Sequence, residues 1–129
     1  MVVDTSALMA IVLGEADAGR YAAALAGAPR LLISAATLLE ADIVATVRLG
    51  PEGHTLVSEL IEGLQMAVVP FDETLAGLAY EGWLRFGRGR HPAALNIGDC
   101  FAYALAKQYG EPLLFKGDDF PRTDIAAAL

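Results

Sequence analysis

The chain has 129 residues, of which 55% are hydrophobic and 19% charged, and its formal net charge is −7 at pH 7. This size and hydrophobicity suffice to bury a core, so we expect one domain over residues 1–129. A lone cysteine excludes an internal disulfide, and no segment resembles an export signal or a membrane span, so we expect a cytoplasmic protein. The acidic charge argues against a nonspecific nucleic-acid coat, but not against a nuclease that uses divalent cations.

Short apolar runs alternate with longer segments of helical periodicity, in chain order. The runs, each a predicted strand, cover 1–4, 30–34, 66–70 and 112–116. The predicted helical segments cover 6–27, 36–65, 72–87 and 96–110, with breaks at Gly14, Gly50, Gly87 and Gly110. Strands that are separated by helices are joined by parallel crossovers. The pattern therefore predicts an α/β fold, a three-layer α/β/α sandwich with a short, mainly parallel central sheet.

Carboxylates follow the first and the last predicted strands. Asp4 ends the first strand, and Asp118 and Asp119 follow the last one. Because parallel strands end at the same edge of a sheet, we expect these acids to lie close together although they are far apart in sequence. Taken alone, Asp4 is equally well explained as a helix cap.

Three more acids lie within the helical segments. Asp99 follows Asn96 by three residues, a spacing that is typical of a cap at a helix start. Glu40 shares a mostly apolar helical face with Ile43 and Val47, and an unpaired carboxylate is costly to bury there. Asp42 has similar surroundings, so periodicity does not decide which of the two turns inward. Carboxylates from four segments would make an oxygen-rich site for Mg²⁺ or Mn²⁺.

Four motifs, in order and spread over nearly the whole chain, carry a resemblance to a known family. They are VVDTSAL, SAATLLEA, LNIGDCFAYALAK and LLFKGDDFPRTDI, and the last two are the more specific. They resemble the PIN-domain ribonucleases, and among these the VapC toxins of type II toxin–antitoxin pairs. The resemblance implies a small parallel-sheet fold, metal-dependent RNA cleavage in the cytoplasm and a cognate VapB-type antitoxin that blocks the site.

The resemblance also assigns the acids. It places them on Asp4, Glu40, Asp99 and the Asp118–Asp119 pair, and so prefers Glu40 over Asp42. Mg²⁺, or Mn²⁺ as a substitute, would be held by Asp4 and Asp99. Many PIN domains carry the fourth acid in a T-x-D-x-x-F pattern that this chain lacks, and we favour Asp119 over Asp118 in that role. The implied reaction is hydrolysis of an RNA phosphodiester bond by in-line attack.

Some residues near these motifs are candidates for substrate binding. Arg88, Arg90 and His91 belong to the only local basic cluster and would contact RNA phosphates, with a solvated loop as the alternative. Ser6 would contact the substrate or the carboxylates, and is equally well explained as part of a helix start. Tyr80, Trp83 and Phe86 are expected in the core or in a subunit contact, and the apolar helices favour a homodimer.

Two other classes of protein are also compatible with these acids. A haloacid-dehalogenase-like phosphotransferase uses an aspartate at a strand end, but would need a second one at the position of Ser6. A non-catalytic α/β module would use the acids to bind a basic peptide. Metal-dependent cleavage of RNA separates both from the ribonuclease.

Overall fold

A four-stranded parallel sheet forms the centre of the molecule, in a computed structural model that describes all 129 residues. The strand order is β3-β2-β1-β4, and Val2 of β1 lies opposite both Leu32 of β2 and Leu113 of β4. The bounds are β1 Val2–Val3, β2 Leu32–Ser34, β3 Ala67–Val69 and β4 Leu113–Leu114. All four predicted strands are therefore confirmed, each shorter than its apolar run.

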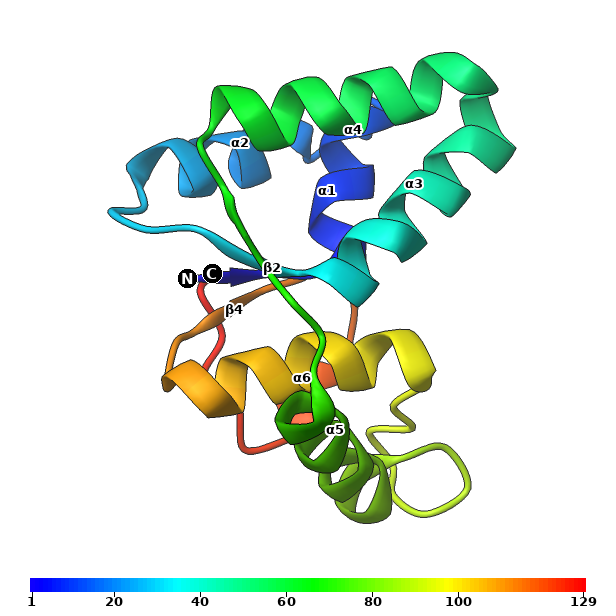
Figure 1. Cartoon of the computed structure of the whole chain (residues 1–129), viewed down its shortest axis with the longest axis vertical. Helices are drawn as coiled ribbons and strands as arrows, with labels where there is room; N and C mark the ends of the chain where they lie inside the picture. Colours follow the sequence, from blue (N-terminus) through cyan, green and yellow to red (C-terminus); the bar gives the residue numbers. More distant parts are fainter.

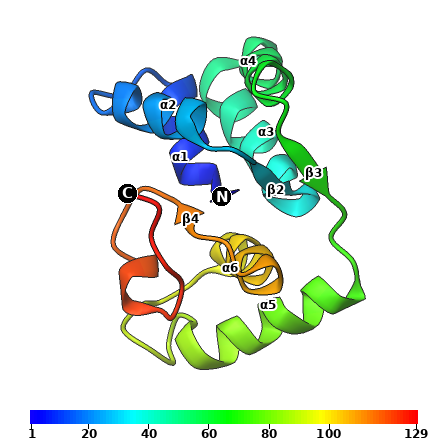
Figure 2. The ribbon, with the colours of Figure 1, turned by 90° about the vertical axis from the view of Figure 1, so that its left-hand side faces the viewer.

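Six helices cover the two faces of this sheet (Figures 1 and 2). They are α1 Thr5–Val12, α2 Ala18–Gly27, α3 Ala35–Leu49, α4 Pro51–Gly63, α5 Glu73–Phe86 and α6 Ile97–Tyr109. Helices α1 to α4 lie on one face, and α5 and α6 lie on the other (Figure 2). None of them is both long and apolar enough to cross a lipid bilayer. The predicted α/β/α sandwich is confirmed.

The strands separate two hydrophobic cores because successive strand side chains point to opposite faces. Val2, Leu32 and Leu113 pack with α5 and α6 in one core. Val3, Ile33 and Leu114 pack with α1 to α4 in the other. The sheet is thus buried on both faces, as parallel sheets are. Polar residues lie instead at the edge where the carboxyl ends of the strands meet.

Polar side chains start the helices that follow the strands. Asp4 caps α1, and the Ser34 hydroxyl caps α3 by accepting a hydrogen bond from the Ala36 amide at 3.2 Å. Between α3 and α4, Gly50 has a φ of 73° and is followed by Pro51, so the helical pattern breaks there. These caps place side chains with free oxygens at the carboxyl edge of the sheet.

The segment after β4 returns across the α5–α6 side of the molecule. It carries a short 3₁₀ turn, Phe120–Arg122, and Ala127 then pairs with Leu113 of β4. Asp124 binds this segment to both helices, because it accepts hydrogen bonds from Tyr103 at 3.0 Å, Lys107 at 3.0 Å and Arg85 at 3.1 Å. The loop that carries Asp118 and Asp119 is therefore anchored at both ends.

Candidate functional site

A pocket of about 290 Å³ opens at the carboxyl edge of the sheet. Four carboxylates line it, from four separate parts of the chain: Asp4, Glu40, Asp99 and Asp119. The other lining residues are Thr5, Ser6, Val44, Asn96, Lys116 and Phe120. The structure thus brings together one acid from each of the four predicted motifs.

Asp4 is the most buried of these acids, with 5% of its surface exposed. Its Oδ2 accepts hydrogen bonds from both the amide and the hydroxyl of Ser6. The Ser6 hydroxyl in turn accepts the Lys116 amide at 2.9 Å, which links the end of β1 to the end of β4. Burial, and to a lesser extent the charge of Glu40, raise the pKa of Asp4. Oδ1 of Asp4 has no hydrogen-bond partner in the protein and is available to a ligand.

Glu40 turns into the pocket from α3, and Asp42 does not. The Glu40 carboxylate packs against Gly98 at the start of α6, and burial together with the charge of Asp99 raises its pKa. Oδ1 of Asp42 instead lies 2.9 Å from Nδ1 of His54 on α4. Asp42 therefore faces α4 at the surface and lies outside the pocket that Glu40 lines.

The apolar face expected around Glu40 is only partly buried. Val44 lines the pocket beside Glu40, whereas Ile43 is 55% and Val47 is 78% exposed. The expectation of a buried stripe was therefore wrong for these two residues, because α4 packs on another side of α3. Glu40 lies at the boundary between the core and the solvent, where a carboxylate is less costly than in the interior.

Asp99 is both a helix cap and a pocket residue. Its Oδ2 accepts the Asn96 amide at 2.9 Å, while the Asn96 side chain accepts the Asp99 amide at 2.9 Å, which completes a capping box. Burial, followed by the charges of Asp4 and Asp119, raises the pKa of Asp99 to about 6. Oδ1 of Asp99 has no hydrogen-bond partner in the protein, so the cap leaves one carboxylate oxygen available to a ligand.

Asp119 and Asp118 differ in position. Both are exposed, but Asp119 lines the pocket and contributes to the raised pKa of Asp99, whereas Asp118 is not among the lining residues. The geometry thus favours Asp119 as the fourth acid. Its function in chemistry stays a prediction.

Lys116 is a pocket residue that sequence reasoning did not single out. Its ammonium pairs with Glu15 and, at 2.8 Å, with Asp17, both in the loop between α1 and α2. These two acids raise the pKa of Lys116. About a hundred residues separate the partners, and no periodicity or motif links them, so the sequence offered no signal for this contact.

The four residues predicted to bind substrate have different surroundings. Ser6 lines the pocket, and Arg88 is near enough to Asp99 for its charge to oppose the rise in that pKa. Arg90 donates from Nε to the Leu84 carbonyl at 3.0 Å and lies over the Trp83 ring. His91 accepts the Ala93 amide at 3.0 Å. Arg90 and His91 thus shape their own loop, and contact with RNA stays a prediction for all four residues.

The carboxylates suit a hard divalent cation by their chemistry, but they are not a preformed cage. No three His, Cys, Asp or Glu side chains lie close enough together to hold a metal ion as they stand. Mg²⁺ does not require such a cage, because it keeps several waters and binds through one or two carboxylates. Asp4 and Asp99 each offer one free oxygen, and the acids raise one another's pKa, so a cation would relieve their repulsion. The residues present therefore fit the predicted metal.

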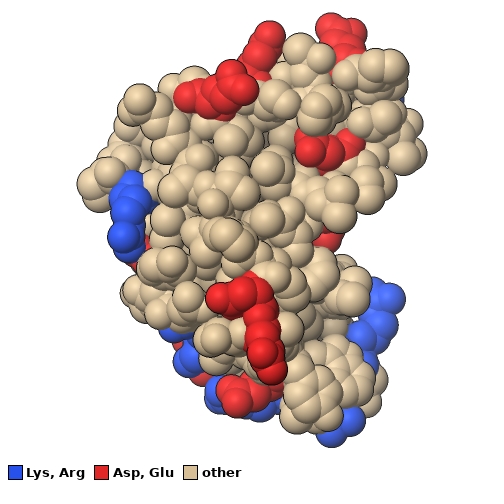
Figure 3. Space-filling model, viewed as in Figure 1, with Lys and Arg blue, Asp and Glu red and all other residues tan.

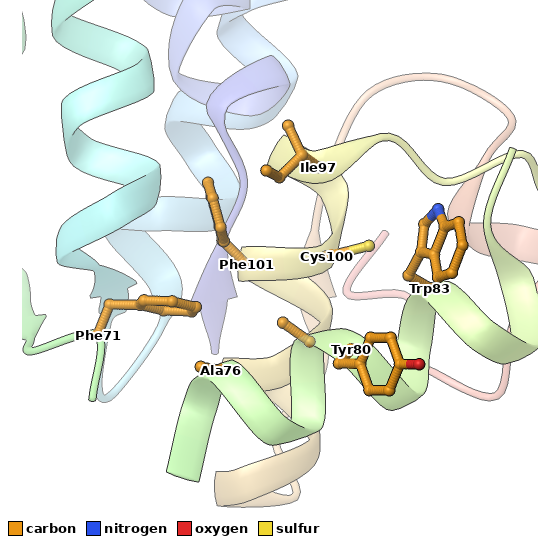
Figure 4. A pocket seen from close by; sticks show the side chains of 8 residues that line it. Phe71, Ala76, Tyr80, Trp83, Ile97, Cys100 and Phe101 are labelled. Carbon is orange, nitrogen blue, oxygen red and sulfur yellow. The ribbon is translucent and has the colours of Figure 1, made fainter. Parts of the chain in front are cut away.

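An apolar groove of about 390 Å³ lies beside this pocket, between α5 and α6 (Figure 4). Tyr80 and Trp83 of α5 and Ile97 of α6 are 60%, 38% and 77% exposed along it. Phe86 is in the core as expected, but the core alternative was wrong for Tyr80 and Trp83. Cys100, at the groove wall, is buried, and burial raises its pKa to about 11, which disfavours the reactive thiolate form.

Charge is unevenly distributed over the surface (Figure 3). On the face shown, most Lys and Arg side chains lie over the half formed by α5 and α6, whereas acidic side chains occur in both halves. The basic residues of the α5–α6 half include Arg85, Arg88 and Arg90. The α5–α6 half, which also holds the apolar groove, thus carries most of the positive charge on this face.

Comparison with known proteins gives a consistent result. The family model described as PIN domain matches residues 1–126. The chain is 48% identical over 130 residues to Ribonuclease VapC28 of Mycobacterium tuberculosis, covering 100% of this chain and 98% of that protein. It is 46% identical over 127 residues to Ribonuclease VapC of Mycolicibacterium smegmatis, covering 98% of each.

Solved structures show the same fold. Mycobacterium tuberculosis VapC20, described as a sarcin-ricin loop cleaving toxin, matches with a TM-score of 0.80 at 20% identity, over 97% of this chain and 95% of that one. FitAcB from Neisseria gonorrhoeae matches with a TM-score of 0.69 at 22% identity, over 98% and 94%. The architecture is thus shared even where few residues are.

Proposed function

This chain belongs to the PIN-domain family and resembles its VapC members over its whole length, and on that premise we propose that it is a metal-dependent endoribonuclease and the toxin of a type II toxin–antitoxin pair. One observation carries the proposal. Four carboxylates that are distant in sequence line a single pocket at the carboxyl edge of the sheet. A helix cap, a solvated acid or an acidic turn explains each acid singly, but none of these explains why all four line one pocket.

Asp4 and Asp99 are the proposed ligands of Mg²⁺ or Mn²⁺. Each has one oxygen engaged by a local amide, Ser6 or Asn96, and the other oxygen free. When bound, the cation would lower the pKa of a water and neutralise charge on the phosphoryl group. Tethering by the two amides fixes the orientation of both carboxylates before substrate arrives, which reduces the entropy cost of binding.

The remaining pocket residues are assigned to the water and the substrate. Glu40 and Asp119, which line the same pocket as the proposed ligands, would orient the attacking water and accept its proton. The Ser6 hydroxyl is engaged with Asp4, so we assign it to positioning that carboxylate. Arg88 is the basic residue of its loop that lies near Asp99, and it is our candidate for contact with an RNA phosphate.

Protein partners follow from the same premise. We propose a VapB-type antitoxin that places a basic side chain among the acids, since a cation can compensate them as a metal would. We also propose a homodimer, supported by the exposed apolar side chains of α5 and the start of α6, because monomers seldom expose a contiguous apolar patch. Cellular RNA as substrate would place the activity in the cytoplasm.

Neither alternative class gains support. The position two residues after Asp4, where a haloacid-dehalogenase-like phosphotransferase needs a second aspartate, is Ser6, and its hydroxyl is bound to Asp4. A non-catalytic module would use the acids to bind a basic peptide, but this alternative does not explain why the chain belongs to the PIN-domain family.

Cleavage of structured RNAs by the purified protein, freed of any partner, tests the proposal. Mg²⁺ or Mn²⁺ should support cleavage and EDTA should abolish it. Asp4→Asn and Asp99→Asn should each lower the rate by roughly 100-fold or more, because an amide keeps the shape but not the charge that holds the cation. Asp72→Asn, at the helix-capping acid of α5, is the matched control and should leave the rate unchanged. Cleavage that survives EDTA or both pocket substitutions would contradict the mechanism.

A further inference from the structure

Gly98 adjoins the pocket although it has no side chain to offer. It is buried at the second position of α6, between Ile97 and Asp99. A Cβ built on it would overlap Oε2 of Glu40 and would lie 2.7 Å from Cδ and 2.9 Å from Oε1 of the same side chain. The Glu40 carboxylate therefore occupies the space that any other residue at position 98 would fill.

The backbone does not explain this glycine. Gly98 is not among the residues with positive φ, so an alanine would adopt its conformation without strain. Glycine within a helix also costs stability relative to alanine. The reason for a glycine at this position is thus one of space.

The other helical glycines show how specific the contact is. A Cβ on Gly82 would meet the Tyr103 ring, and one on Gly53 would meet the backbone of Ala45, which are contacts of helix packing. Gly77 and Gly63 have nothing within 4 Å. Gly98 is the one glycine whose close neighbour is a carboxylate.

We propose that Gly98 is a positioning residue, whose missing side chain lets the Glu40 carboxylate pack against the first turn of α6 and enter the same pocket as Asp99. This inference rests on the proposed ribonuclease function. The amino end of a helix favours a negative charge, which helps to hold Glu40 there. Because only the end of a flexible side chain is in the way, a methyl group at position 98 displaces the carboxylate and leaves the fold in place.

Gly98→Ala tests the proposal, with Gly77→Ala as the matched control. Gly98→Ala should lower the cleavage rate roughly 10- to 100-fold, as loss of an outer partner of a metal site does, and should weaken Mn²⁺ binding measured by calorimetry. In EDTA it should melt no lower than the parent, because the methyl group favours the helix. Gly77→Ala, on an exposed part of α5, should change neither rate nor Mn²⁺ binding.

The same substitution in a Glu40→Ala background separates positioning from general damage. With the Glu40 side chain shortened, the added methyl group meets no carboxylate, so Gly98→Ala should cause no further loss of rate or of Mn²⁺ affinity beyond twofold. Recovery of folding in the double variant, should Gly98→Ala alone prove unstable, would equally support the contact.

Equal losses in the two backgrounds would overturn the inference, because Gly98 would then act on something other than Glu40. An unchanged rate and Mn²⁺ affinity in Gly98→Ala would overturn it as well. A parent protein that neither binds Mn²⁺ nor cleaves RNA would instead refute the proposed function, so the two failures are distinguishable.

Discussion

The hydroxyl of Ser6 donates a hydrogen bond to Oδ2 of Asp4. Because the same hydroxyl accepts the Lys116 amide, its proton is directed at the carboxylate and the carboxylate is held in one orientation. A side chain that was expected at a helix start, or against the substrate, thus connects the first strand of the sheet to the last at the pocket wall.

Ser6→Ala should lower the cleavage rate by about tenfold, since it removes the hydroxyl that orients a proposed metal ligand. The backbone amide of Ser6 still binds Asp4, so the fold should lose only about 1 kcal/mol of unfolding free energy. Ser6→Thr keeps the hydroxyl and is the matched control. Equal rates for the alanine and threonine variants would exclude the hydroxyl from this function.

Asp119→Asn should lower the cleavage rate at least tenfold more than Asp118→Asn, because Asp119 lines the pocket and Asp118 does not. The two variants differ by one position in the same exposed loop, so each serves as the control of the other. Initial rates in Mg²⁺ would decide. The reverse order would make Asp118 the fourth acid.

Asp99→Asn should stabilise the metal-free protein at neutral pH, because it removes a carboxylate whose charge is opposed by burial, Asp4 and Asp119. The amide oxygen can still accept the Asn96 amide, so the cap is kept. Because this carboxylate is only half-buried, solvent screening reduces the gain to about 1 kcal/mol, a few degrees in melting temperature. In EDTA, a lower melting temperature for Asp99→Asn but not for the α5 cap variant Asp72→Asn would show that Asp99 matters mainly to the fold.

This stability difference should depend on pH. The pKa of Asp99 in the folded protein, about 6, exceeds its ordinary 3.8. The stability that this group contributes is thus fully present below pH 3.8 and is lost as the pH rises through 6. In EDTA, the gap between Asp99→Asn and the parent should therefore be largest above pH 7 and should narrow toward pH 4. A stability difference between Asp99→Asn and the parent that does not change with pH would contradict a raised pKa at Asp99.

Metal affinity should rise with pH, whereas the stability of the metal-free parent should fall. A carboxylate must lose its proton to bind a cation, so Mn²⁺ affinity should fall by about tenfold between pH 7.5 and pH 5 through Asp99 alone. Calorimetry at the two pH values measures it, with the buffer's own Mn²⁺ binding subtracted. Equal affinity at both values would remove Asp99 from the proposed ligands.

Much of the fold was predictable because its signals are local. The apolar runs that became β1 to β4 are short and bounded, and Gly14 and Gly50 divide the helical segments where the structure does. The lengths of the strands were overestimated: Asp4 leaves the first run as the cap of α1, and β2 begins only at Leu32 within its run.

The candidate site was predictable only in part. Strand ends indicated Asp4, Asp118 and Asp119, but the choice between Glu40 and Asp42 depends on how α3 packs, which leaves Asp42 beside His54 of the next helix. The contact of Gly98 with Glu40 and the pairing of Lys116 with Asp17 join distant segments, and neither leaves a periodic trace. Exposure of Tyr80 and Trp83 likewise depends on what packs over α5, which apolarity alone does not specify.

The central position of β1 has a consequence for synthesis of the protein. β1 is made first, yet one of its two neighbours in the sheet is β4, and Asp119 comes later still. A chain growing on the ribosome can thus form α1 to α4 and pair β1 with β2, but it has no partner for the other side of β1 and no fourth acid until its last segment emerges. The central sheet and the four-carboxylate pocket can therefore be completed only after β4 and the segment that carries Asp119 have been made.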